Sequence, residues 1–88
     1  MLRLELLSTD HCSLCEQALD SLLGMPQVAG LELVVVDIAA DDQLMADYGE
    51  QIPVLRALGQ ELAAPFTADQ VLRFLDRLAA QHQTDDGH

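Results

Sequence analysis

Residues 10–16 read Asp10-His11-Cys12-Ser13-Leu14-Cys15-Glu16, which places two cysteines in a C-x-x-C motif. An apolar run over 2–7 precedes this stretch, and apolar residues at helical spacing follow it as far as residue 23. The motif therefore lies between a predicted strand and a predicted helix, which is the order that dithiol redox chemistry needs. Ser13 and Glu16 have the spacing of a capping box, so we expect the helix to begin at Cys12 or Ser13.

The start of this helix gives the two sulfur atoms different roles. Residues three apart inside a helix have Cβ atoms roughly 5 to 6 Å apart, whereas a disulfide needs about 3.8 Å. We therefore expect Cys12 at the edge of the loop, free to turn inward, and Cys15 held by the helix. The unpaired amides of the first turn would then point at the Cys12 sulfur and favour its thiolate over its thiol.

The composition describes one small acidic domain. Half of the 88 residues are hydrophobic but only 3% are aromatic, so the core must consist mainly of Leu, Val and Ala. Four basic residues, all Arg, face fifteen acidic ones, for a formal net charge of −11. This chain cannot assemble the cationic surface that nucleic acid or an anionic membrane requires, so neither is expected as a partner. We expect a monomer.

The cysteine count and the N-terminal residues predict the compartment. Two cysteines in one motif cannot build the several bridges that small secreted proteins use. Met1 leads directly into the first apolar run, without a basic and long apolar leader. No apolar segment approaches the length of a membrane span. These features predict a cytoplasmic protein.

Strand and helix signals alternate along the middle of the chain. The first helix is expected to end near Leu23, with Gly24 as a left-handed cap. The segment 31–38 is β-branched and nearly all apolar, which predicts a strand covered on both faces. Asp41 and Asp42 can begin a second helix, which ends before Gly49. Its predicted buried side consists of Leu44, Met45 and Tyr48.

Two strands and a helix complete the predicted pattern. A third strand over 52–58 is entered through Pro53, and 61–63 is expected to be a short fourth strand antiparallel to it. Thr67 and Gln70 form a capping box for a third helix, and Phe66 with Val71 forms a hydrophobic staple. The apolar stripe of this helix is predicted at Val71, Leu72, Leu75, Leu78 and Ala79. Residues 1–80 are predicted to form a single domain, followed by a flexible polar tail over 81–88.

The order βαβαββα, with C-x-x-C at the start of the first helix and Ile-Pro before the third strand, resembles the thioredoxin fold. Within that superfamily the chain is most similar to the small glutaredoxin-like proteins, and the resemblance covers about residues 2–80. It implies an α/β domain with a central four-stranded mixed sheet flanked by three helices. It also implies that the protein is a thiol–disulfide oxidoreductase.

The resemblance assigns roles to individual residues. Cys12 would be the attacking nucleophile and Cys15 the resolving thiol. Pro53 would be the cis-proline beside the disulfide, and cis peptide bonds are almost confined to X-Pro. The backbone of Ile52 would pair with an extended substrate segment, as an added strand does. His11, directly before the nucleophile, is the third predicted substrate-binding residue.

The chain departs from glutaredoxins in the features that receive glutathione. Its interior pair is Ser13-Leu14 where a glutaredoxin usually has Pro and an aromatic residue, and Asp10 and His11 stand where a basic residue is usual. The segment 63–65 reads Ala-Ala-Pro in place of a Gly-Gly step. The expected substrate is therefore a disulfide-bearing protein or a small thiol compound. No cofactor or metal is expected, and glutathione as the reductant is left open.

Two other functions are compatible with the same residues. The protein could be a non-catalytic thioredoxin-fold module that binds a partner protein at the Pro53 edge, with the cysteines as small buried hydrophobes. It could also be a metal or iron–sulfur carrier in which two chains each contribute a cysteine pair. A closed zinc site within one chain needs four ligands, and His82 and His88 lie in the predicted tail.

Overall fold

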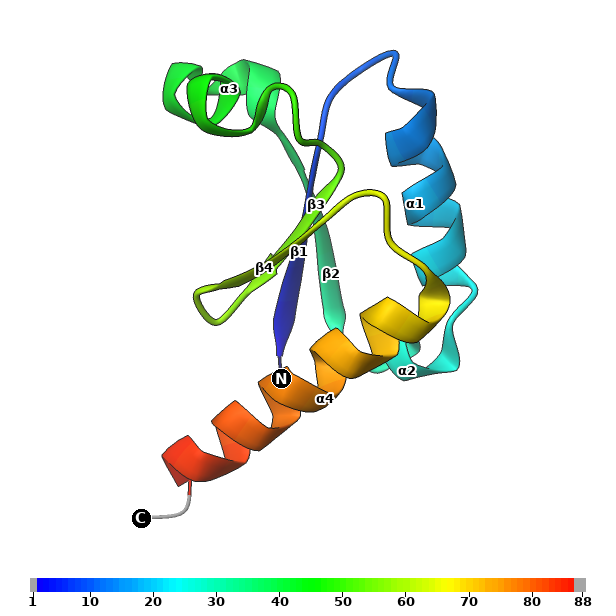
Figure 1. Ribbon diagram of the computed structural model, residues 1–88, viewed down its shortest axis with the longest axis vertical. Coiled ribbons are helices and arrows are strands. Elements are labelled where there is room, and N and C mark those ends of the chain that lie inside the picture. Colours follow the sequence, from blue (N-terminus) through cyan, green and yellow to red (C-terminus); the bar gives the residue numbers. More distant parts are fainter. Residues whose placement is uncertain (1, 87–88) are drawn as a thin grey trace.

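The structure is a computed structural model that describes the backbone of residues 2–86 and the side chains of residues 2–81. The elements in chain order are β1 (Arg3–Ser8), α1 (Ser13–Leu23), α2 (Pro26–Ala29), β2 (Glu32–Asp37), the 3-10 turn η1 (Ile38–Ala40), α3 (Asp42–Tyr48), β3 (Val54–Ala57), β4 (Gln60–Ala63) and α4 (Ala68–Asp86). Figure 1 labels the four strands and the four α-helices. The predicted order βαβαββα is confirmed, and α2 and η1 are additions that the sequence patterns did not predict.

The four strands form one mixed sheet in the order β2-β1-β3-β4. β1 pairs in parallel with β2 and antiparallel with β3, and β3 pairs antiparallel with β4. Leu6 lies at the centre of the sheet, opposite Val35 on one side and Leu55 on the other. The fold is therefore the predicted α/β thioredoxin-like arrangement.

The side chains of β1 alternate between the two faces of the sheet and build two hydrophobic clusters. Leu4 and Leu6 belong to the larger cluster, which α1 and α4 cover. Leu7 points to the opposite face, where it packs with Ile38 and Val54 beside α3. Leu6 and Leu7 are both fully buried, so both faces of the sheet are covered near the end of this strand.

The prediction that the second strand is covered on both sides was wrong. Among the strands of the described residues, β2 lies at the edge of the sheet and pairs only with β1. Its residues are exposed or half-buried, and Val35 is 48% exposed. A run of β-branched residues indicates a strand without indicating its place in the sheet, because edge and central strands share this composition.

The helices differ from the predictions in three details. Gly24 caps α1 with a φ of −84°, so the expected left-handed cap is absent there. Met45 is 47% exposed because the short α3 turns only Leu44 and Tyr48 toward the sheet. Ala79, predicted on the inner stripe of α4, is exposed, and the centre of that stripe is the fully buried Phe74.

The start of α4 follows the prediction and its end does not. Thr67 Oγ1 accepts a hydrogen bond from the Gln70 amide over 3.1 Å, and Gln70 Oε1 accepts one from the Thr67 amide over 2.8 Å, which is the predicted capping box. The helix continues to Asp86, so the predicted polar tail from Gln81 is helical up to that residue, and residues 87–88 lie outside the described part. A polar segment can extend a helix that its first turns have already nucleated, because each added residue contributes one hydrogen bond without a new nucleation step.

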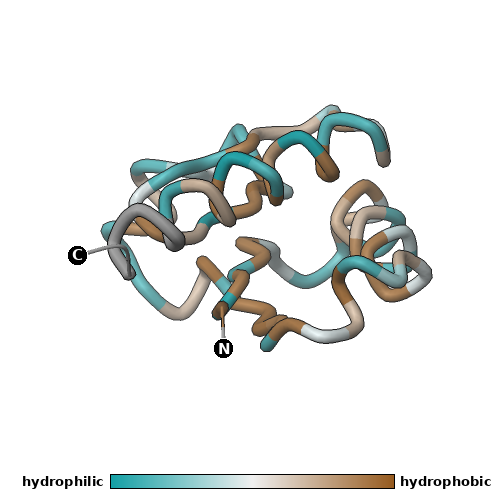
Figure 2. Tube along the Cα trace, turned by 90° about the horizontal axis from the view of Figure 1, so that it is seen from below, coloured by the Kyte–Doolittle hydropathy of each residue, from teal (hydrophilic) through white to brown (hydrophobic). Residues whose placement is uncertain are grey.

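The hydropathy of α4 agrees with its position over the larger hydrophobic cluster. In Figure 2, α4 alternates between hydrophobic and hydrophilic turns as it leads to the C-terminus. This alternation is that of a helix with one face on a core. Within the described residues, no helix combines the length and the apolar character needed to cross a membrane.

Candidate functional site

The two cysteines lie at the start of α1, after the loop that connects it to β1, and they form a disulfide. Cys12 is the N-cap of α1, with extended backbone angles (φ −111°, ψ 102°), and Cys15 lies in the first turn. The preceding His11 has a φ of 61°, in the left-handed region, where the chain reverses from the strand into the helix. The Cα atoms of the two cysteines are 5.2 Å apart, a separation that a disulfide spans.

The two sulfur atoms have different surroundings, as the position of the helix start predicted. Cys15 is only 3% exposed, whereas Cys12 is half-buried. The backbone amide of Cys15 donates a hydrogen bond to the Cys12 Sγ over 3.2 Å. The cap of this helix is therefore the Cys12 sulfur, and the predicted capping box of Ser13 and Glu16 was wrong, because Ser13 is already the first helical residue.

Ile52 and Pro53 lie on the segment that enters β3, and the bond between them is cis, as predicted. Pro53 is fully buried, and its carbonyl oxygen accepts a hydrogen bond from the Ala64 amide over 3.0 Å. Within the described part of the chain, the Ile52 backbone has no hydrogen-bond partner. A second cis bond, Ala64–Pro65, was not predicted.

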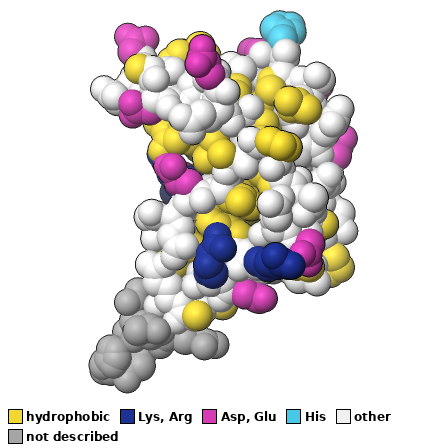
Figure 3. Space-filling view, in the orientation of Figure 1, with side chains coloured by type: hydrophobic (Ala, Val, Ile, Leu, Met, Phe, Trp, Pro, Cys, Tyr) yellow, Lys and Arg dark blue, Asp and Glu magenta, His cyan; other side chains and the backbone are white. Residues whose placement is uncertain are grey.

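A groove of about 470 Å³ runs along α1 from the cysteine turn. One wall is the side of α1 that carries Leu14, and the other is formed by the segments 50–53 and 64–68, which Figure 1 shows bending toward α1. Figure 3 shows hydrophobic surface on this face, extending from beneath the histidine toward the arginine side chains near the lower end. The groove is lined by Leu14, Gln17, Ala18, Ser21, Leu22, Met25, Glu50, Gln51, Ile52, Pro53, Ala64, Pro65, Phe66, Thr67, Ala68 and Val71.

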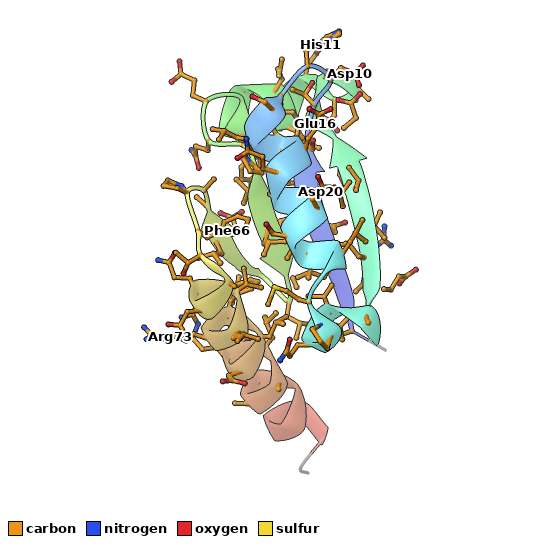
Figure 4. The ribbon with its side chains drawn as sticks, turned by 90° about the vertical axis from the view of Figure 1, so that its right-hand side faces the viewer. Asp10, His11, Glu16, Asp20, Phe66 and Arg73 are labelled. Atoms are coloured by element: carbon orange, nitrogen blue, oxygen red, sulfur yellow. A yellow bond between two sulfur atoms is a disulfide. The ribbon has the colours of Figure 1, made fainter. Side chains whose placement is uncertain are left out.

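The structure places four of the five predicted site residues either in the disulfide or on the wall of the groove. Cys12 and Cys15 are bonded, and Ile52 and Pro53 line the groove that begins at Leu14, the residue before Cys15. His11 is exposed at the tip of the loop, as Figure 4 shows, and is not among the groove residues.

Sequence reasoning missed the groove residues outside the C-x-x-C and Ile-Pro motifs. Leu14, an apolar residue in the first turn of α1, is 61% exposed and lines the groove. Phe66 was assigned to the staple of α4; it does pack against the cluster that contains Val71, and it also lines the groove. The signal that could have identified Leu14 was its position between two cysteines, where a buried side chain would hide the reactive sulfur.

A charged cluster occupies the face of the sheet away from the groove. Arg56 donates from Nε to Glu5 Oε1 over 2.9 Å and lies over the ring of Tyr48, with 5.9 Å between Cζ and the ring centroid. The Tyr48 hydroxyl donates a hydrogen bond to Glu61. This hydrogen bond raises the pKa of Tyr48, because ionisation would remove the donated proton, and Arg56 acts in the opposite direction. Arg56 is therefore a surface ion-pair partner.

The fold and the cysteine pair define a thioredoxin-like domain with a C-x-x-C at the start of its first helix. Residues 3–76 match the family described as Glutaredoxin-like domain (DUF836), and the chain belongs to this family.

Two solved structures are similar to this chain. The Northeast Structural Genomics target protein XcR50 from X. campestris has 37% sequence identity and a TM-score of 0.73, over 84% of this chain and 96% of that one. The protein Ne2328 from Nitrosomonas europaea has 28% identity and a TM-score of 0.69, over 84% of this chain and 89% of that one. No curated protein matches the chain in sequence.

Proposed function

We propose that this protein is a dithiol–disulfide oxidoreductase with Cys12 as its nucleophile and Cys15 as its resolving thiol. The observation that carries the proposal is the asymmetry of the pair: a half-buried sulfur at a helix N-cap is bonded to a buried sulfur within the same helix. The half-buried Cys12 is the more accessible member and can meet a substrate, and the buried Cys15 can act only on what Cys12 has captured.

The proposed reaction uses two thiol–disulfide exchanges. In the first, the Cys12 thiolate attacks one sulfur of a substrate disulfide, a Cys12–substrate bond forms, and the other substrate sulfur leaves as a thiolate that takes up a proton. In the second, the Cys15 thiolate attacks the Cys12 Sγ, closes the Cys12–Cys15 disulfide and releases the second substrate thiolate. The substrate gains two electrons and two protons, which an external dithiol must return to the protein.

The groove beside the cysteines supports the proposed substrate contacts. The unpaired backbone of Ile52 can bond to an extended segment by strand addition, with Pro53 beneath it. His11, adjacent to the nucleophile and exposed, can contact the part of the substrate outside the groove. We propose a cytoplasmic, monomeric enzyme that acts on disulfide-bearing proteins or small thiol compounds and binds neither nucleic acid nor membranes.

The test is a single turnover with the chemically reduced protein and a disulfide-bonded peptide. The wild type is expected to release both peptide thiols and to end with its own cysteines oxidised. Cys15→Ser should instead retain one half of the peptide on Cys12 as a mixed disulfide, detected by intact mass and released by a thiol. Cys12→Ser should give neither product.

Activity that survives in Cys12→Ser would contradict the proposed nucleophile. Partner binding without any disulfide reduction in the wild type would favour the non-catalytic binding module. Circular dichroism of both variants checks that the fold is intact. We expect it to be intact, because each substitution replaces one side-chain sulfur atom by an oxygen atom.

A further inference from the structure

The four arginines supply every permanent positive charge of the side chains, since the sequence has no lysine. On the face of the sheet away from the groove, Arg3 and Arg56 both pair with Glu5, over 3.8 Å and 2.9 Å. On α4, Arg73 pairs with Asp69 over 2.9 Å, and Arg77 lies against the ring of Phe74.

None of these arginines is among the described residues that line the groove. Figure 4 places Arg73 on α4, farther from the cysteine loop along the molecule than Phe66. A carboxylate bound in the groove would therefore meet no arginine among the described lining residues.

The groove itself carries one charged lining residue, the exposed Glu50. The other lining side chains are apolar or uncharged, with Leu14, Ile52 and Phe66 among the larger ones. The whole protein has a formal net charge of −11, so the potential around the groove favours cations over anions. An occupant must therefore combine apolar side chains with neutral or positive charge.

We propose that the groove binds an extended protein segment whose reacting cysteine is flanked by apolar and basic residues, and that it discriminates against glutathione. This inference rests on the proposed oxidoreductase function and names the substrate class of the same site. The segment pairs with the backbone of Ile52, its apolar side chains contact Leu14 and Phe66, and a basic side chain reaches Glu50. Glutathione offers carboxylates to a groove that has no cation to receive them.

The chemical step is the one already described, so the selectivity lies in binding. Complementary charge raises the association rate and like charge lowers it, and salt weakens both effects. The difference between basic and acidic substrates is therefore expected in KM and in kcat/KM, while kcat changes little.

The test compares disulfide-bonded peptides of equal length that share an apolar core around the cysteine and carry flanking Lys, Gln or Glu. Glutathione disulfide is the fourth substrate, and a dithiol regenerates the protein. At low ionic strength we expect kcat/KM to fall in the order Lys, Gln, Glu, with roughly tenfold or more between the extremes and glutathione disulfide near the Glu peptide. The spread should narrow when salt is added.

Equal rates for the Lys and Glu peptides, or faster reduction of glutathione disulfide than of the Lys peptide, would overturn the proposal and leave the oxidoreductase function intact. If no peptide is reduced at all, the proposed function itself fails.

Two matched variants locate the effect in the groove. Glu50→Gln is expected to reduce the preference for the Lys peptide by roughly two- to fivefold, the equivalent of one exposed ion pair. Glu32→Gln removes the same charge from the exposed edge strand β2 and should leave the preference nearly unchanged. Glu50→Arg should raise kcat/KM for glutathione disulfide. Equal effects of Glu50→Gln and Glu32→Gln would show that net charge, and not the groove, selects the substrate, and would refute the assignment of Glu50.

Discussion

The Cys12 sulfur accepts a hydrogen bond from the backbone amide of Cys15, over 3.2 Å, at the N-terminus of α1. The same sulfur is bonded to the Cys15 sulfur, so Cys15 contacts the Cys12 sulfur through both its side chain and its backbone amide. In the reduced protein this amide remains available to the Cys12 thiolate, and the positive end of the helix dipole favours the same form. Cys15 lies inside the turn and is buried, so it lacks this advantage.

The first prediction concerns the alkylation rates of the two cysteines. Cys15→Ser leaves Cys12 as the single thiol, and Cys12→Ser leaves Cys15. At neutral pH, iodoacetamide should modify Cys12 roughly tenfold or more faster than Cys15, because the thiolate is the reactive form and Cys12 is more accessible. Mass spectrometry of timed samples measures both rates. Equal rates under native conditions would contradict the asymmetry, and unfolding in urea should remove the difference.

The second prediction concerns Tyr48, which is the only tyrosine in a chain without tryptophan. Its hydrogen bond to Glu61 raises its pKa above the ordinary value of 10.0. Phenolate absorbance, which reports this residue alone, should therefore rise at a higher pH in the folded protein than in urea. Glu61→Gln should lower the midpoint, and Arg56→Gln should raise it further, because Arg56 stabilises the phenolate.

The same shift makes a prediction about stability at high pH. A folded-state pKa above the unfolded value means that the folded protein holds the proton more tightly. The stabilisation is therefore complete below about pH 10 and is lost as the pH rises through the folded-state pKa. Tyr48→Phe should remove this alkaline component from urea unfolding curves; an unchanged pH dependence above pH 10 would be inconsistent with the Glu61 hydrogen bond.

The local features of the fold were predictable because each depends on residues close in sequence. The caps at Asp41 and Thr67 need only a few neighbouring residues, and both are present. The cis bond at Pro53 was implied by the resemblance to the thioredoxin fold, and it is present too. The strand predicted from the apolar run over 2–7 is also present as β1, in which Leu6 and Leu7 are fully buried.

The features that the sequence did not reveal depend on tertiary placement. Strand order decides that Val35 is half exposed, and the order cannot be read from the apolar run of β2. The groove arises because separate segments carrying Glu50 and Phe66 bend toward α1. Phe74 was missed because the helical stripe was drawn from the leucines, whereas the direction of α4 across the sheet selects which residues are buried.

The third prediction concerns the turn between β3 and β4, where Leu58 and Gly59 both have positive φ, 50° and 75°. This two-residue turn has the backbone of a type I′ hairpin, which favours Asn followed by Gly. Leu58 is partly exposed, so Leu58→Asn should raise the free energy of unfolding by about 0.5 to 1 kcal/mol. Urea denaturation of the oxidised protein measures the change.

The glycines provide a matched comparison for this turn. An added Cβ meets no atom within 4 Å at either Gly59 or Gly30, but Gly30 has a φ of −88°. Gly59→Ala should therefore destabilise the protein by about 1 kcal/mol, and Gly30→Ala should stabilise it by about 0.4 to 1 kcal/mol. If both substitutions have the same sign, backbone conformation is not the determining factor.

The fourth prediction concerns Asp41, whose carboxylate accepts hydrogen bonds from the amides of Gln43 and Leu44 over 2.8 and 3.2 Å. Asp41→Ala leaves both amides at the start of α3 without this partner and should lower the free energy of unfolding by about 1 kcal/mol. Asp42→Ala removes the same charge from the adjacent exposed position, where only the helix dipole is affected, and should lower it by about 0.3 kcal/mol. Urea denaturation gives both values, and hydrogen exchange at the Gln43 and Leu44 amides should accelerate in Asp41→Ala alone. The helix α3 packs Leu44 and Tyr48 against the smaller cluster, so its stability contributes to that of the whole protein. Equal losses of unfolding free energy in the two variants would mean that the charge, and not the cap, stabilises this helix.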